Sequence, residues 1–140
     1  MPIDYRVEHE RRLVLAEGRG AVTADDIFAY QREVWSRADV SGYDELVDMS
    51  GVDAIVEPSS DGMRRLAELS AQMDPPSGGT KFAIVARQDF PFGLGRMYEA
   101  YRALNQRSTK EVAVFRSREE ALRWLSRTGV LDVKPGKPGQ

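Results

Sequence analysis

Cysteine, a second histidine and a long apolar run are all missing from the sequence, and each absence excludes a class of site. The 140 residues include no cysteine, which excludes disulfides, thiolate metal sites and cysteine nucleophiles. His9 is the only histidine, so histidine-rich metal sites are excluded as well. No apolar run approaches the ~18–20 residues that span a bilayer, and the first residues lack a basic segment followed by an apolar stretch. We therefore expect a soluble, unexported, cytoplasmic protein with no integral membrane segment.

The composition that remains is typical of one globular domain. Hydrophobic residues make up 41% of the chain and charged residues 30%, and a chain of this length buries enough surface for one ordinary core. The net charge of −2 is too near zero to favour a nucleic-acid partner. Residues 130–140 have little apolar content, so we expect a domain over 1–129 and a flexible C-terminal tail over 130–140.

Hydrophobic periodicity predicts alternating strands and helices along this domain. Ile3, Tyr5 and Val7 alternate with polar residues and a charged turn leads to Val14–Ala16, which predicts an antiparallel hairpin. Further strands are predicted at Glu45–Met49, where Ser50–Gly51 should end the strand, at Lys81–Ala86 and at Glu111–Phe115. Helices are predicted from Thr23 to about Ala38, from Pro58 to Met73, up to Leu104 after an aromatic lead-in at Asp89–Gly95, and after Ser117.

This order of elements indicates an α/β fold. Each interior strand is followed by a helix, and such units favour right-handed crossovers to a parallel neighbouring strand. We therefore predict a single domain with a mixed, mostly parallel sheet of about five strands and with four helices. Ligand sites in open sheets of this kind gather beyond the carboxyl ends of the parallel strands.

An aromatic, glycine-containing segment around the predicted third helix is the first candidate site. Aromatic side chains at a helix start favour an apolar pocket with a polar rim, and the glycines allow close backbone approach. The same spacing is also typical of ordinary core residues, which leaves that alternative open. The candidate ligand-binding residues are Phe90, Phe92, Gly93, Leu94, Gly95, Arg96, Met97, Tyr98 and Tyr101.

Two serines at the start of the predicted second helix form the second candidate. Ser59 and Ser60 are residue types that cap helices, and this capping role is the plain interpretation. A phosphate on either serine would lie at the positive end of the helix dipole, yet close to the acidic Asp61. The pair is therefore also a candidate regulatory site, together with Asp48 at the predicted end of a strand.

An enzyme is the weaker hypothesis for this sequence. Asp48 with Arg96 is the only pair that we considered for a hydrolase, and general acid–base chemistry needs a matched partner group that the sequence does not place. We therefore predict no catalytic residues, no metal site and no cofactor.

Several of these segments together resemble the SpoIIAA-like branch of the STAS superfamily. They are the strand Leu46–Asp48, the serines in Ser59–Met63, the strand Phe82–Val85, the segment Phe92–Glu99, and Val114–Phe115 followed by Glu120–Leu125. The resemblance implies a small α/β domain. It also implies a serine at the second helix that is phosphorylated to control binding of a partner kinase, for which Pro58–Gly62 is the matching region here. Some SpoIIAA-like proteins are thought to hold small nonpolar molecules.

The leading functional hypothesis is a non-enzymatic, STAS-like binding or regulatory module that engages a protein partner through the serine region. The alternative is a carrier of a small apolar or lipid-like ligand in a pocket near the third helix. A structural homodimer is a further possibility, because amphipathic helices lie beside an exposed sheet edge.

Overall fold

Five strands form one mixed sheet in the computed structural model, which describes residues 2–56 and 59–126. The strands are β1 (Ile3–Glu8), β2 (Leu13–Thr23), β3 (Asp44–Val56), β4 (Thr80–Val85) and β5 (Lys110–Phe115), and they lie side by side in chain order. The β1–β2 pair is antiparallel and the other three pairs are parallel. The predicted hairpin and the mostly parallel sheet are therefore confirmed.

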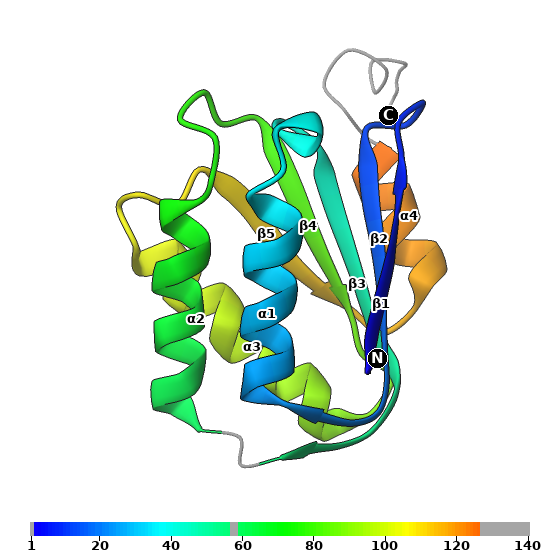
Figure 1. Ribbon diagram of the computed structural model, residues 1–140. Coiled ribbons are helices and arrows are strands. Elements are labelled where there is room, and N and C mark those ends of the chain that lie inside the picture. Colours follow the sequence, from blue (N-terminus) through cyan, green and yellow to red (C-terminus); the bar gives the residue numbers. More distant parts are fainter. Residues whose placement is uncertain (1, 57–58, 127–140) are drawn as a thin grey trace, which may run out of the picture.

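Four helices cover the two faces of this sheet (Figure 1). They are α1 (Ala24–Trp35), α2 (Ser60–Gln72), α3 (Asp89–Leu104) and α4 (Arg118–Ser126), with a short 3-10 helix η1 (Ala38–Val40) after α1. Helices α1, α2 and α3 lie against one face, and α4 lies against the other (Figure 1). The predicted α/β class with five strands and four helices is confirmed.

Predicted capping residues begin α1 and α4, and also α2, which Ser59 caps. At α1, the Thr23 hydroxyl accepts from the Asp26 amide at 3.1 Å, and the Asp26 carboxylate accepts from the Thr23 amide at 2.9 Å. At α4, the Ser117 hydroxyl accepts from the Glu120 amide at 3.2 Å. The predicted first helix is shorter than expected, because it ends at Trp35 and Ala38 lies in η1.

The third strand is longer than predicted, and this changes the position of Asp48. Ser50–Gly51 does not end the strand, because β2 continues alongside it and supplies partners such as Arg19 for Gly51. Register shifts after Glu17 and after Gly20 absorb the irregularity in this long pair of strands. Asp48 therefore lies in the middle of β3 and not at its carboxyl end.

The third helix also begins earlier than predicted. Residues Asp89–Gly95 are not a lead-in but the first turns of α3. Pro91 is tolerated there, because the first-turn amides of a helix have no partner within the helix. The predicted start of the second helix at Pro58 and the predicted tail at 130–140 lie outside the described residues.

Separate apolar clusters fill the two sides of the sheet. On the side of α4, the fully buried Leu46 packs with Leu15, Val85 and Leu125. On the side of α1 to α3, residues from β1, β3 and β4 meet those of the three helices, and this side also contains the largest part of the core. The candidate site lies on this second side.

Candidate functional site

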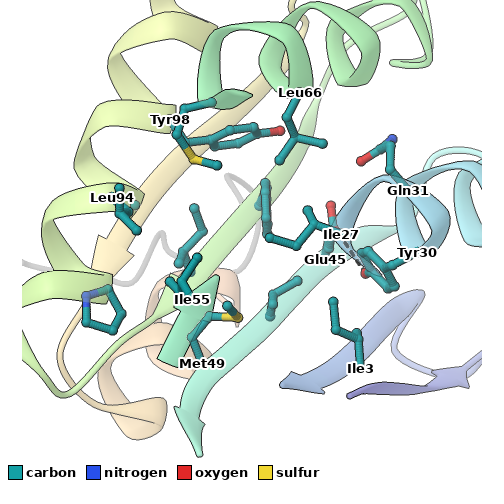
Figure 2. Close-up of a pocket in the computed structure, with 16 residues that line it drawn as sticks. Ile3, Ile27, Tyr30, Gln31, Glu45, Met49, Ile55, Leu66, Leu94 and Tyr98 are labelled. Carbon is teal, nitrogen blue, oxygen red and sulfur yellow. Dashed lines mark hydrogen bonds between the residues drawn. The ribbon is translucent and has the colours of Figure 1, made fainter. Parts of the chain in front are cut away.

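An apolar pocket lies between the sheet and helices α1, α2 and α3 (Figure 2). Its volume is about 100 Å³. Side chains from β1, β3 and β4 form its floor, and those of the three helices form its walls. The lining residues are Ile3, Ile27, Tyr30, Gln31, Glu45, Val47, Met49, Ile55, Met63, Leu66, Phe82, Ile84, Pro91, Leu94, Gly95 and Tyr98.

Strand alternation and one glycine explain how the sequence builds this pocket. Alternate residues of a strand point to the same face, so Glu45, Val47 and Met49 of β3 all face the helices. At Gly95, a β-carbon would lie 3.2 Å from the Val114 Cγ1 atom and 3.4 Å from the Ile84 Cγ2 atom. Glycine at this position therefore allows α3 to lie close to the sheet.

A buried carboxylate forms the polar part of the pocket wall. The Glu45 side chain is only 3% exposed. Its Oε2 atom accepts hydrogen bonds from the Tyr30 hydroxyl at 2.7 Å and from the Trp35 indole at 3.1 Å, and its Oε1 atom lies 3.4 Å from the Lys110 Nζ atom (Figure 2 shows the Tyr30 contact). The Lys110 ammonium also lies 3.5 Å from the centre of the Trp35 ring. Burial, and then the charge of Glu45, raise the pKa of Tyr30 well above its ordinary value.

A second polar cluster holds Tyr98 in place at the side of α3. The Arg102 guanidinium donates to the Tyr98 hydroxyl at 2.7 Å and to the Ser108 hydroxyl at 2.9 Å, and it forms a buried ion pair with Asp74. The Tyr98 ring packs edge-on against Phe82 with a centroid distance of 5.8 Å. Burial raises the pKa of Tyr98. The phenol is thereby held neutral and fixed in the wall.

Comparison with solved structures gives a match over most of the chain. The matched protein is an uncharacterised member of the DUF3478 family from Shewanella loihica PV-4, and its structure is described as having a SpoIIAA-like fold. The match covers 88% of this chain and 93% of that one, with a TM-score of 0.54 and 16% sequence identity. This chain has a SpoIIAA-like fold. No family model and no curated protein matches the chain.

The predicted resemblance to the SpoIIAA-like fold is thus confirmed at the level of the fold. At 16% identity the likeness carries nothing about ligands, partners or activity. Within the described residues, no helix is both long and apolar enough to cross a membrane, and no group of three or more acidic or histidine side chains is placed to hold a metal ion.

The candidate ligand-binding residues of this SpoIIAA-like domain separate into two groups. Leu94, Gly95 and Tyr98 line the pocket, and Tyr101 is half-buried against the same core. Phe90, Gly93 and Arg96 are exposed, Phe92 packs under the Arg116 guanidinium, and Met97 is half-buried without lining the pocket. The structure thus brings one side of α3 to the cavity. A ligand-binding role for any of these residues stays a prediction.

Sequence reasoning missed the other residues that line the pocket, and with them the polar cluster around Glu45. Tyr30, Glu45 and Lys110 come from α1, β3 and β5, and their long separation in the chain hides the cluster that they form. One signal was available for Glu45. In a strand with helices on both faces, its alternation with Val47 and Met49 places a charge on a buried face, where an unpaired charge is costly.

The two serines lie at the start of α2 and do not line the pocket. Ser59 caps the helix, and its hydroxyl accepts from the Gly62 amide at 2.9 Å. Ser60 is the exposed first residue of the helix. Asp61 next to them is paired with Arg64 and Arg65. Phosphorylation of either serine stays a prediction.

The pair proposed for an enzyme is not brought together. Asp48 faces α4, where its carboxylate lies 3.2 Å from the Arg118 guanidinium and accepts from the Ser50 amide at 2.9 Å. Arg96 lies on α3, on the other side of the sheet, and pairs with Glu99 at 3.2 Å. The Asp48–Arg96 hypothesis was therefore wrong, because the alternation of β3 directs Asp48 away from the third helix.

Proposed function

We propose that this protein is a non-enzymatic binding module that holds a small apolar ligand in the pocket beneath α1, α2 and α3. The observation that carries this proposal is the apolar cavity of about 100 Å³ between the sheet and the three helices. The pocket is partly open to solvent, so a small molecule can reach it without unfolding of the domain. Pockets of this apolar character with a few polar groups are typical ligand sites.

The arrangement of the wall supports a binding role more than a purely structural one. Met49 and Met63 line the pocket, and methionine side chains adapt their shape to a bound molecule. Three separate helices contribute, so the pocket depends on the whole fold and not on one loop. The confirmed SpoIIAA-like fold is compatible with this proposal, in which the domain acts by binding, without a catalytic group.

Toluene is a suitable first probe for this pocket. We expect titration with toluene to shift the NMR signals of Leu94 and Tyr98, and Leu94→Trp to weaken toluene binding by about tenfold or more because the larger ring fills the space. Leu104→Trp is the matched control, because Leu104 lies on the same helix and is 80% exposed. Failure of toluene to bind the wild type, or equal binding to both variants, would contradict the proposal.

A phosphoregulated protein partner is the second candidate, favoured by the exposure of both serines at the α2 N-terminus. Phosphate at such a position meets the positive end of the helix dipole. We expect treatment with cell extract and ATP to label the wild type, and Ser59→Ala with Ser60→Ala to abolish the label. An intact mass that shows no phosphate after this treatment would count against the switch.

A further inference from the structure

We propose that the ligand of this pocket is an uncharged molecule about the size of one aromatic ring that donates a hydrogen bond to the Glu45 Oε1 atom. Phenol represents this class, and small alcohols belong to it. This inference rests on the proposed function, because it assigns the chemistry of the ligand in the same pocket. It follows from the size of the cavity, from its charge balance and from the remaining capacity of one carboxylate.

The size of the pocket fits a ligand of one ring. A cavity of about 150 Å³ lined by aliphatic and aromatic side chains is known to accommodate benzene. The present cavity measures about 100 Å³, and the flexible side chains of Met49 and Met63 border it. A single ring therefore fits with small adjustments of these side chains.

The charges around the cavity already balance, which favours a neutral ligand. Glu45 is paired with Lys110, and both side chains are at most 5% exposed. On the side of Tyr98, the buried Arg102 is likewise paired with Asp74. A carboxylate or ammonium ligand would bring an uncompensated charge into an apolar site, which is costly. A carboxylate would in addition lie near the like charge of Glu45.

The Glu45 carboxylate has capacity left for one more donor. An ionised carboxylate offers about four lone-pair positions on its two oxygens. Oε2 accepts from both Tyr30 and Trp35. Oε1 has one partner among the described residues, the Lys110 ammonium, and that contact is long at 3.4 Å. The free lone pair is thus on Oε1, in a side chain that lines the pocket and is shielded from bulk water.

The other polar groups of the wall already have hydrogen-bond partners within the protein. The Tyr30 hydroxyl donates its hydrogen to Glu45, the Tyr98 oxygen accepts from Arg102, and the Gln31 Oε1 atom accepts from the Ser70 hydroxyl at 3.0 Å. Among these acceptors Glu45 carries a negative charge, and hydrogen bonds to a charged acceptor are the stronger ones. Glu45 is therefore the acceptor through which we expect the pocket to distinguish a hydroxyl from a methyl group of the same size.

Phenol and toluene test this inference because they differ only in that phenol has a hydroxyl where toluene has a methyl group. The test variant combines Glu45→Leu with Lys110→Met, since replacing both members of a buried ion pair by apolar residues is often neutral or stabilising. Calorimetric titration should show that the double variant binds phenol about tenfold more weakly than the wild type, while its affinity for toluene changes by less than about threefold. Benzoate should not bind the wild type.

Three outcomes separate this inference from the proposed function. If phenol and toluene lose affinity by the same factor, or benzoate binds as tightly as phenol, the role of Glu45 is overturned while toluene binding still supports the pocket. If neither probe binds the wild type, both proposals are overturned. If the double variant does not fold, Glu45→Gln combined with Lys110→Met replaces it, because this pair of changes keeps the side-chain size at position 45, leaves no unpaired buried charge and weakens the acceptor. A selective loss of about threefold for phenol is then expected, and equal losses overturn the inference.

Discussion

The two faces of the sheet are built in different ways. Against α4, aliphatic side chains such as Leu46, Val85 and Leu125 pack into a cluster whose buried members are all apolar. Against α1, α2 and α3, the core contains a cavity, and charged residues such as Glu45 and Arg102 are buried beside it. Both faces share the same strands, so alternate residues of one strand belong either to the apolar cluster toward α4 or to the face with the cavity.

This difference indicates a division of roles between the faces. The face toward α4 gains its stability from close packing. The face toward α1 to α3 leaves space unfilled and buries ion pairs, which are weak contributors to stability compared with apolar residues of similar volume. A face with unfilled space of this kind fits a binding role. The stability of this face then depends on each buried charge keeping its partner.

The largest expected effect is the loss of one of these partners. Arg102→Met leaves the carboxylate of Asp74 without its buried counter-ion, and we expect the free energy of unfolding to fall by about 3–5 kcal/mol. Chemical denaturation with urea would measure it. The control is Arg96→Met, because Arg96 lies on the same helix but is 64% exposed and should change stability by no more than about 0.5 kcal/mol. If both variants lost the same free energy of unfolding, the buried ion pair of Arg102 would contribute no more to stability than the exposed Arg96.

Truncation of one leucine on each face compares the packing directly. Leu46→Ala on the side of α4 removes a fully buried side chain and should cost about 3–4 kcal/mol. Leu66→Ala at the pocket should cost about 2 kcal/mol, because a side chain beside a void already lacks contacts on that side. Urea denaturation of both variants provides the measurement. A larger loss for Leu66→Ala would show that the pocket face is the better packed one.

Much of the fold was predictable because it depends on local patterns. The alternation of Ile3, Tyr5 and Val7 predicted the hairpin, and the residues at Thr23 and Ser117 predicted helix starts that the structure confirms. The end of β3 was not predictable in the same way. Ser50–Gly51 is a local stop signal, but the neighbouring β2 supplies hydrogen-bond partners beyond it, and this pairing is a property of the tertiary structure.

The candidate site was predictable only in part. The aromatic, glycine-containing segment was a candidate for an apolar pocket, and three of its residues, Leu94, Gly95 and Tyr98, line the pocket of the structure. The exposure of Phe90 could not be inferred while Asp89–Gly95 was expected to precede the helix, because helical spacing assigns a side only to residues that belong to the helix. The partnership of Glu45 with Lys110 joins residues 65 positions apart, and no local pattern encodes it.

The tyrosine that donates to Glu45 makes stability depend on alkaline pH. Because the pKa of Tyr30 is raised well above its ordinary value of 10, the unfolded chain releases this proton at a lower pH than the folded protein does. Stability is therefore complete below about pH 10 and falls as the pH rises further. Between pH 10 and 11 we expect the wild type to lose about 1 kcal/mol more than Tyr30→Phe, as measured by urea midpoints. Parallel curves for both proteins would contradict this origin of the effect.

The smallest expected effect concerns two glycines of α3 that differ in their surroundings. Gly93 is exposed, and no atom lies within 4 Å of the position that a β-carbon would take, so Gly93→Ala should stabilise the protein by about 0.5–1 kcal/mol through helix propensity alone. Gly95→Ala gains the same propensity, but its β-carbon would meet Val114 at 3.2 Å and push α3 away from the sheet. Thermal unfolding should therefore rank Gly93→Ala above the wild type and Gly95→Ala clearly below Gly93→Ala. If both substitutions stabilise equally, α3 has room to move outward, and the close approach at Gly95 does not set the depth of the pocket.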